Sequence, residues 1–267
     1  MNRIEQKFKE LKRAKKKAFI AYITAGDPTL AVTKELVPAL EGAGVDMIEL
    51  GIPFSDPLAD GPTIQAASQR ALKGGVSLKK VLAAVRDMRK TTGIPIMFMT
   101  YFNPVLKYGV GRFMADCRRS GVDGVIVPDL PCSEAKETAR YAKRTGVAQI
   151  FLAAPTSIKT SLKEISNRSR GFIYYVSLTG VTGARRSLSG EITRKVRSIK
   201  SISGKPVAVG FGVSTSSQAR EVARSADGVI VGSALVKIVE NNIDDKAAII
   251  SKVSKFARSL SEAIHNE

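Results

Sequence analysis

Hydrophobic residues along the chain fall into short continuous runs, and segments with the spacing of amphipathic helices lie between them. One unit recurs: a helical segment, a glycine, a short polar step and an apolar run, as in EGAGVDMIEL (41–50) and RSGVDGVIVPDL (119–130). A second form places a proline directly before the run, as in TTGIPIMFM (91–99). Because glycine ends helices in the left-handed conformation and proline fits the first residue of a strand, both forms predict helix-to-strand connections.

The runs are continuous rather than alternating, which is typical of parallel strands buried on both faces. No linker or change of composition divides the 267 residues. We therefore predict an α/β fold, a single (β/α)8 TIM barrel that covers residues 1–267 as one domain. An open doubly wound sheet is the alternative, but it would more often show fewer strands and a GxGxxG turn, and TAGDPT (24–29) has one glycine. The predicted strands lie near 18–24, 45–50, 94–99, 122–128, 147–153, 171–177, 206–210 and 227–231.

Two further helices are expected. The segment 4–14 precedes the first strand and is predicted to close the bottom of the barrel, and the segment 234–240 follows the eighth strand as a short helix. The run 18–25 follows a basic leader like that of a signal peptide, but the leader contains Glu5 and Glu10 and no clean cleavage site follows. No apolar run approaches the ~20 residues that span a bilayer, so we expect a cytoplasmic protein without membrane partners.

Few residues are suited to metal binding or nucleophilic catalysis. The single histidine, His265, lies two residues from the end of the sequence, where chains usually fray, which argues against Ser-His-Asp or Cys-His catalysis and histidine-ligated metals. Cys117 and Cys132 lack metal-ligand spacing and indicate a reduced compartment. We expect no metal and no cofactor. The chemistry must rest on carboxylates, hydroxyls, lysines or backbone dipoles.

The chain has 42 Lys and Arg against 24 Asp and Glu, a formal net charge of +18. Such a field would attract nucleic acid, an anionic membrane or a phosphorylated metabolite. The basic residues are spread over most helical segments, and the few aromatic residues do not alternate with lysines as a base-stacking surface would. The favoured interpretation of the positive charge is therefore that the basic residues form solvated helix faces. A field that attracts an anionic substrate is the second interpretation, and nucleic acid is not expected as a partner.

Carboxylates gather at the end of the second predicted strand, where a TIM barrel has its active site. Glu49 shares a face with Met47, and if Ile48 packs against the helices, Glu49 points into the barrel mouth. Burial there would raise its pKa into the range useful for proton transfer, whereas the plainer interpretation is that it caps an amide or pairs with a lysine. Asp56 and Asp60 follow in a proline-rich loop, and either could instead serve as a turn or helix-capping residue.

Glycines end the last three predicted strands. Strand six runs into SLTGVTGARRS (177–187), strand seven ends in GFGV (210–213), and strand eight ends in Gly232 and Ser233 at the start of the short helix. Glycine lets backbone N–H groups approach an anion, and a helix N-terminus adds a favourable partial charge. The pattern predicts a phosphate-binding site at this end of the barrel.

Several strings resemble the tryptophan synthase alpha subunit family over nearly the whole chain. They are ITAGDP (23–28), IELGIPFSDPLADGPTIQ (48–65), MTYFNPV (99–105), VPDLP (127–131), TGVTGA (179–184) and GFGVS (210–214), of which the second is the most specific. The resemblance implies a carbon–carbon lyase that cleaves indole-3-glycerol phosphate to indole and glyceraldehyde 3-phosphate in a retro-aldol reaction. A metal-dependent aldolase would want histidine ligands and a Schiff-base aldolase a lysine at the strand ends, and neither is found there.

The same resemblance implies a role for each candidate residue. Glu49 is the acid–base residue at the reacting indole carbon, and Asp60 accepts a hydrogen bond or proton from the indole N–H. The loops carrying Asp60 and residues 178–190 are expected to close over the substrate. The implied phosphate contacts are Gly183, Gly212, Gly232 and Ser233, and the implied indole-pocket walls are Tyr22, Tyr174 and Phe211, for which plain barrel core is the alternative.

Family members work with a beta subunit that carries pyridoxal phosphate, so the resemblance implies an alpha2beta2 assembly with that cofactor only in the partner. Tyr22 stands where phenylalanine is common in the family, and Cys132 stands where other small or apolar residues are usual. Two alternatives stay open at this point: a stand-alone lyase that releases free indole, and a basic nucleic-acid-binding barrel.

Overall fold

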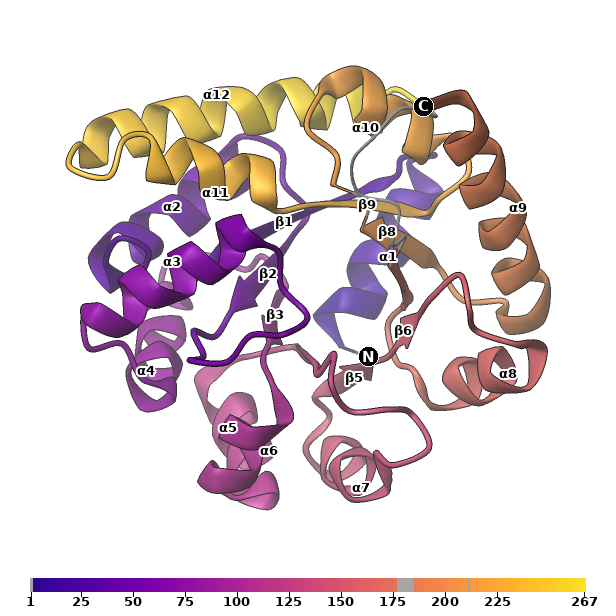
Figure 1. The fold of residues 1–267 in the computed structure, drawn as a ribbon, viewed down its shortest axis with the longest axis horizontal. Coiled ribbons are helices and arrows are strands. Elements are labelled where there is room, and N and C mark those ends of the chain that lie inside the picture. Colours follow the sequence, from indigo (N-terminus) through magenta and orange to yellow (C-terminus); the bar gives the residue numbers. More distant parts are fainter. Residues whose placement is uncertain (1, 177–184, 211) are drawn as a thin grey trace.

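The computed structural model describes residues 2–176, 185–210 and 212–267, and of residues 185–189 and 191 it describes the backbone only. Parallel strands form a central barrel, and helices surround it in a ring (Figure 1). The described strands are β1 Ala18–Thr24, β2 Met47–Gly51, β3 Ile96–Met99, β4 Gly124–Ile126, β5 Ala148–Ile150, β6 Leu152–Ala153, β7 Ile173–Val176, β8 Val207–Gly210 and β9 Gly228–Val231. The described helices are α1 Arg3–Arg13, α2 Leu30–Gly42, α3 Pro62–Lys73, α4 Leu78–Met88, α5 Phe102–Tyr108, α6 Val110–Ser120, α7 Lys136–Thr145, α8 Lys159–Arg168, α9 Arg185–Ser203, α10 Ser216–Ala223, α11 Ser233–Glu240 and α12 Lys246–His265.

The sheet closes on itself through a single stretch of chain. Its order runs from β5 through β4, β3, β2, β1, β9, β8 and β7 to β6. The two ends of that order, β5 and β6, are separated only by Phe151, whose carbonyl accepts a hydrogen bond from the Tyr174 amide at 3.1 Å. The predicted fifth strand, 147–153, is thus interrupted at Phe151, and the barrel predicted from eight apolar runs is confirmed.

Strand residues alternate between two apolar environments. Phe19, Ala21 and Ile23 of β1 belong to the core between the barrel and its helices, whereas Ala18 and Ile20 belong to the barrel interior. All seven residues of β1 are buried. Burial on both faces is the reason why the strands appear in the sequence as continuous apolar runs.

The N-terminal helix closes the bottom of the barrel, where the strands begin. Ile4, Phe8 and Leu11 of α1 join the interior cluster, and the Phe8 ring lies 5.5 Å from the ring of Phe172. Figure 1 shows α1 behind the opening of the strand ring, inside the circle of helices. The prediction for residues 4–14 is confirmed, with the helix ending at Arg13.

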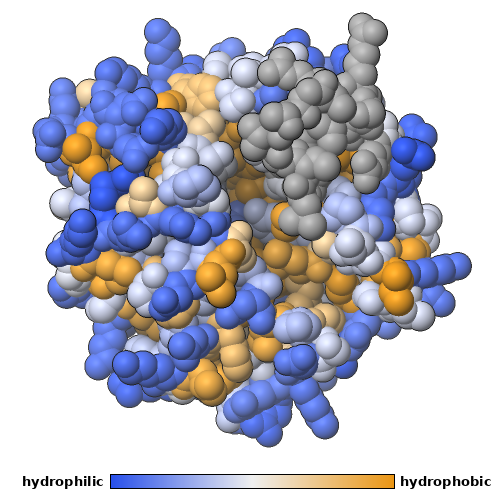
Figure 2. Space-filling view, in the orientation of Figure 1, coloured by the Kyte–Doolittle hydropathy of each residue, from blue (hydrophilic) through white to orange (hydrophobic). Residues whose placement is uncertain are grey.

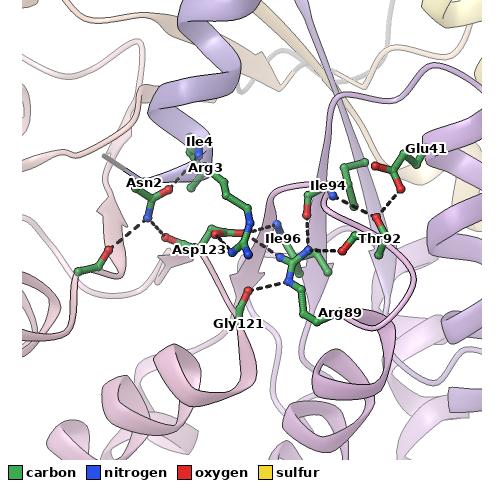
Figure 3. Close-up of polar contacts among 11 residues, drawn as sticks. Asn2, Arg3, Ile4, Glu41, Arg89, Thr92, Ile94, Ile96, Gly121 and Asp123 are labelled. Carbon is green, nitrogen blue, oxygen red and sulfur yellow. Dashed lines mark hydrogen bonds and ion pairs between the residues drawn. The ribbon is translucent and has the colours of Figure 1, made fainter.

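A buried carboxylate fastens this helix to the strands (Figure 3). Asp123 Oδ1 accepts a hydrogen bond from Arg3 Nη1 at 3.0 Å. Its Oδ2 accepts from Arg89 Nη2 at 2.7 Å and from the Ile96 amide at 3.0 Å. Asn2 Nδ2 adds a bond of 2.6 Å to the Asp123 carbonyl. A single aspartate therefore joins the starts of α1 and β3 to the end of α4.

The prediction that His265 frays is wrong. Helix α12 continues to His265, whose Nε2 lies 2.8 Å from Asp46 Oδ2 and whose Nδ1 lies 3.1 Å from Ser261 Oγ. Asp46 also accepts from the Phe19 amide, and the Ser261 hydroxyl donates to the Gly44 carbonyl. These contacts lie at the bottom of the barrel, directly before β2, where they fasten the C-terminal helix.

Replacing Asp123 by Asn should lower the free energy of unfolding by roughly 3 kcal/mol, because the mostly buried Arg89 loses its charge partner. Chemical denaturation measures the change. The matched control is Asp87→Asn, which removes exposed pairs with Lys90 and Lys34 and should leave the midpoint unchanged. Equal losses in both variants would contradict the role given to Asp123.

Candidate active site

Glu49 is a completely buried acid at the barrel mouth. Its neighbours Ile48 and Leu50 pack into the helix-facing core, and Met47 lies in the barrel interior, so the alternation of β2 directs Glu49 inward. The side chain has 0% exposure, and neither carboxyl oxygen has a hydrogen-bond partner among the described residues. The two plainer interpretations, that Glu49 caps a neighbouring amide or that it pairs with a lysine, are therefore wrong.

The surroundings of Glu49 favour its neutral form. Burial raises its pKa from the usual 4.5 to about 8, and the negative charge of Asp60 adds to this. The Tyr174 hydroxyl lies close enough to oppose the rise, although it does not complete a hydrogen bond to either oxygen. Glu49 is thus mainly protonated at neutral pH and can donate a proton.

Asp60 lies in the loop between β2 and α3, and two side chains hold that loop. The Tyr101 hydroxyl accepts a hydrogen bond from the Ala59 amide at 3.0 Å, and Gln65 Nε2 donates to the Asp60 carbonyl at 2.9 Å. Burial raises the pKa of Asp60 to about 6, while a hydrogen bond from Tyr101 opposes the shift. Asp60 is therefore mainly ionised at neutral pH beside a protonated Glu49.

The helix-capping interpretation of Asp60 is wrong. Helix α3 begins at Pro62, its N-cap is Gly61, and no side chain caps its first turn. Asp56 is different from Asp60: it is exposed, and its carboxylate accepts a hydrogen bond from the neighbouring Ser55 hydroxyl. Of the two aspartates in this loop, only Asp60 is brought together with Glu49.

Two tyrosines stand beside Glu49 on other strands. Tyr22 of β1 pairs in register with Glu49, and its hydroxyl lies 3.4 Å from Thr24 Oγ1. Tyr174 of β7 packs against Gly210, where a Cβ would lie 2.9 Å from its ring. Burial raises the pKa of both hydroxyls, so they remain neutral donors near the acid.

The start of helix α11 lies beside Tyr22. The helix begins at Ser233 with Gly232 as its N-cap, one residue earlier than predicted, and a Cβ at Gly232 would lie 3.2 Å from the Cβ of Tyr22. The first-turn N–H groups of a helix lack partners within it and attract anions. Gly212 adopts a left-handed φ of 50°, which favours glycine. Gly183 and Phe211 lie outside the described residues.

Similarity to known proteins identifies the family of this chain. A family model described as tryptophan synthase alpha chain matches residues 8–265. The tryptophan synthase alpha chain of Geobacter sulfurreducens is 48% identical over 266 residues, covering 100% of both chains. This chain belongs to the tryptophan synthase alpha chain family. The family's members are lyases that cleave indole-3-glycerol phosphate.

Solved structures of tryptophan synthase agree with this assignment. The crystal structure of the alpha subunit from Legionella pneumophila str. Paris has a TM-score of 0.93 at 38% identity and covers 100% of both chains. A structure of the tryptophan synthase a2b2 complex from Pyrococcus furiosus, described as the basis of mutual activation in that complex, has a TM-score of 0.85 at 42% identity, with 92% of this chain and 98% of that one covered.

The sequence analysis did not identify Tyr101 as a site residue. In this tryptophan synthase alpha chain homologue, the Tyr101 hydroxyl holds the Asp60 loop by accepting a hydrogen bond from the Ala59 amide. Its ring also packs against Phe54, with ring centroids 5.3 Å apart. Its position just after β3 was the available signal.

The prediction of a closing loop over residues 178–190 is partly wrong, because helix α9 begins at Arg185. Residues 178–184 lie outside the described residues. Within the described ranges, no three His, Cys, Asp or Glu residues are grouped to hold a metal, and no helix is long and apolar enough to cross a bilayer.

The raised pKa of Glu49 predicts a pH-dependent stability. The folded protein keeps a proton that the unfolded chain releases above pH 4.5, so this contribution to stability is lost as the pH rises from about 4.5 to about 8. Denaturation from pH 5 to pH 8.5 should show wild type losing roughly 4 kcal/mol relative to Glu49→Gln. The exposed Glu137→Gln control should show no such trend. A constant difference between wild type and Glu49→Gln would contradict a raised pKa.

Proposed function

We propose that this chain cleaves indole-3-glycerol phosphate by acid–base catalysis, with Glu49 as the acid and Asp60 as the anion at the indole nitrogen. The observation that carries the assignment is the completely buried, unpartnered Glu49 carboxyl group with a pKa of about 8, beside an Asp60 whose pKa is about 6. Two carboxyl groups with separated pKa values can serve as acid and base at one pH.

The reaction proceeds in two proton transfers. Glu49 donates its proton to carbon three of the indole, and the ring loses aromaticity and carries positive charge toward its nitrogen. Asp60 stabilises that charge by accepting a hydrogen bond from the N–H group. The Glu49 carboxylate then takes the proton of the glycerol hydroxyl, the carbon–carbon bond breaks, an aldehyde forms, and the bonding electrons restore the aromatic indole.

The phosphate group positions the substrate for these steps. The N–H groups at the start of α11, near Ser233, and the backbone at Gly212 are suited to bind it, together with Gly183 and the loop after β7. Gly232 permits close approach of this site to Tyr22. With Tyr174 and Phe211, Tyr22 would enclose the indole. Binding energy from the phosphate can thus orient the scissile bond against Glu49.

Glu49→Gln and Asp60→Asn should each lower kcat for indole release by about 10²–10⁴-fold, because each removes one proton-transfer or charge-stabilising group. The matched control is Asp56→Asn, which changes an exposed carboxylate of the same loop and should retain wild-type turnover. Indole can be assayed with the isolated chain. Full activity of both Glu49→Gln and Asp60→Asn would refute the mechanism.

We further propose that the chain works in the cytoplasm with a tryptophan synthase beta subunit, in an alpha2beta2 assembly, and that pyridoxal phosphate belongs to that partner. The similarity to the alpha chain of the mutually activating Pyrococcus furiosus a2b2 complex supports this proposal. In this chain, Leu58 of the Asp60 loop is 93% exposed, which is unusual for a large apolar side chain at a site that must exclude water. Apolar surface also gathers around the centre of the face in Figure 2.

Addition of the cognate beta subunit should raise kcat for cleavage at saturating substrate, because docking near Leu58 would hold the Asp60 loop closed. Leu58→Ser should reduce this stimulation. A matched control is Ile158→Ser, which removes another exposed apolar side chain outside that loop. High turnover of the isolated chain, unchanged by the partner, would instead identify a stand-alone lyase that releases indole.

A further inference from the structure

A hollow lies at the opposite end of the barrel from Glu49. Its volume is about 630 Å³, within the range of small-molecule sites. It lies where β1, β8 and β9 begin, between the end of α1 and the end of α9. The lining residues are Phe8, Lys12, Lys15, Lys16, Lys17, Lys200, Gly204, Lys205, Pro206, Arg224, Asp227 and Glu267.

The lining contains seven cationic side chains and two carboxylates, and the two carboxylates are already engaged. Lys200 Nζ lies 2.8 Å from Asp227 Oδ1, and Arg224 Nε lies 3.5 Å from Glu267 Oε2. Lys205 is also engaged, since its ammonium donates to the Ser169 carbonyl at 2.6 Å. These contacts neutralise part of the charge and fix the rim of the hollow.

Four lysines remain: Lys12, Lys15, Lys16 and Lys17. None of them forms an ion pair with a carboxylate among the residues that the structure describes. They lie within six consecutive positions, at the end of α1 and directly before β1. Like charges that line one hollow repel one another, and an anion with several charges would relieve that repulsion.

The backbone at Lys15 gives a second, independent observation. Lys15 has φ = 55°, the left-handed conformation, just after the end of α1, where glycine is the usual residue. It is the one non-glycine residue with positive φ in the described parts of the chain. A lysine in a position that favours glycine costs stability, and such strain is characteristic of functional sites.

We propose that this hollow binds a compact oligophosphate, a small molecule with two or more linked phosphate groups. Lysine ammonium groups bind phosphate as point charges, and a group of four lysines matches a ligand with several phosphates better than a ligand with a single phosphate. The hollow does not suit single-stranded nucleic acid, because its one aromatic side chain, Phe8, is only 7% exposed and offers no stacking face. The site is separate from the proposed phosphate contacts near Ser233.

The test is calorimetric titration of the full chain with tripolyphosphate at 0.15 M KCl (about physiological ionic strength), with glycerol 3-phosphate present to occupy the proposed active-site phosphate position. We expect saturable binding that Lys12→Ala/Lys16→Ala weakens about tenfold or more. The matched control, Lys79→Ala/Lys143→Ala, removes the same charge from exposed positions of α4 and α7 and should bind as wild type. ATP in a parallel arm distinguishes a nucleotide from an inorganic source.

Lys15→Gly separates a binding role from a structural one. Glycine relieves the left-handed strain, so the variant should melt about 2 °C higher while it binds tripolyphosphate more weakly. No binding by wild type, equal losses in the control double variant, or binding of a short RNA but not of tripolyphosphate would each overturn the proposal.

Discussion

A carboxyl group buried without a hydrogen-bond partner is costly, and the site of this barrel is organised around such a group. Glu49 has no water-exposed surface and no partner oxygen or nitrogen among the described residues, so the neutral form is the one that the fold tolerates. The same burial that raises its pKa places it against Tyr22 and Tyr174. Stability and reactivity at this position are therefore set by one physical quantity, the cost of charging the side chain.

The elements that surround Glu49 are joined by the guanidinium group of Arg70. Arg70 of α3 bonds Asp27 Oδ1 at 2.8 Å, in the loop after β1, and Glu240 Oε1 at 3.0 Å, at the end of α11. Helix α3 follows the Asp60 loop directly, and α11 begins at Ser233. One guanidinium thus connects the supports of the proposed indole site and the proposed phosphate site.

The barrel could be predicted from the sequence because its signals are local: continuous apolar runs, glycines after helices and a helix before the first strand. The inward direction of Glu49 also followed from alternation with Ile48. What could not be predicted depends on contacts between distant residues. Nothing near Tyr101 in the sequence shows that it holds Ala59, and the position of His265 gave no sign that Asp46 lies within reach. The break of the fifth strand at Phe151 arises from closure of the barrel, which periodicity does not encode.

Both terminal helices are tied to the bottom of the barrel, α1 through Asp123 and α12 through Asp46. Asp46 directly precedes β2, the strand that carries Glu49. During synthesis on a ribosome, residue 46 leaves the exit tunnel long before residue 265 does. The residue that leads into the strand bearing Glu49 therefore waits for its polar partner His265 until 219 further residues have been made.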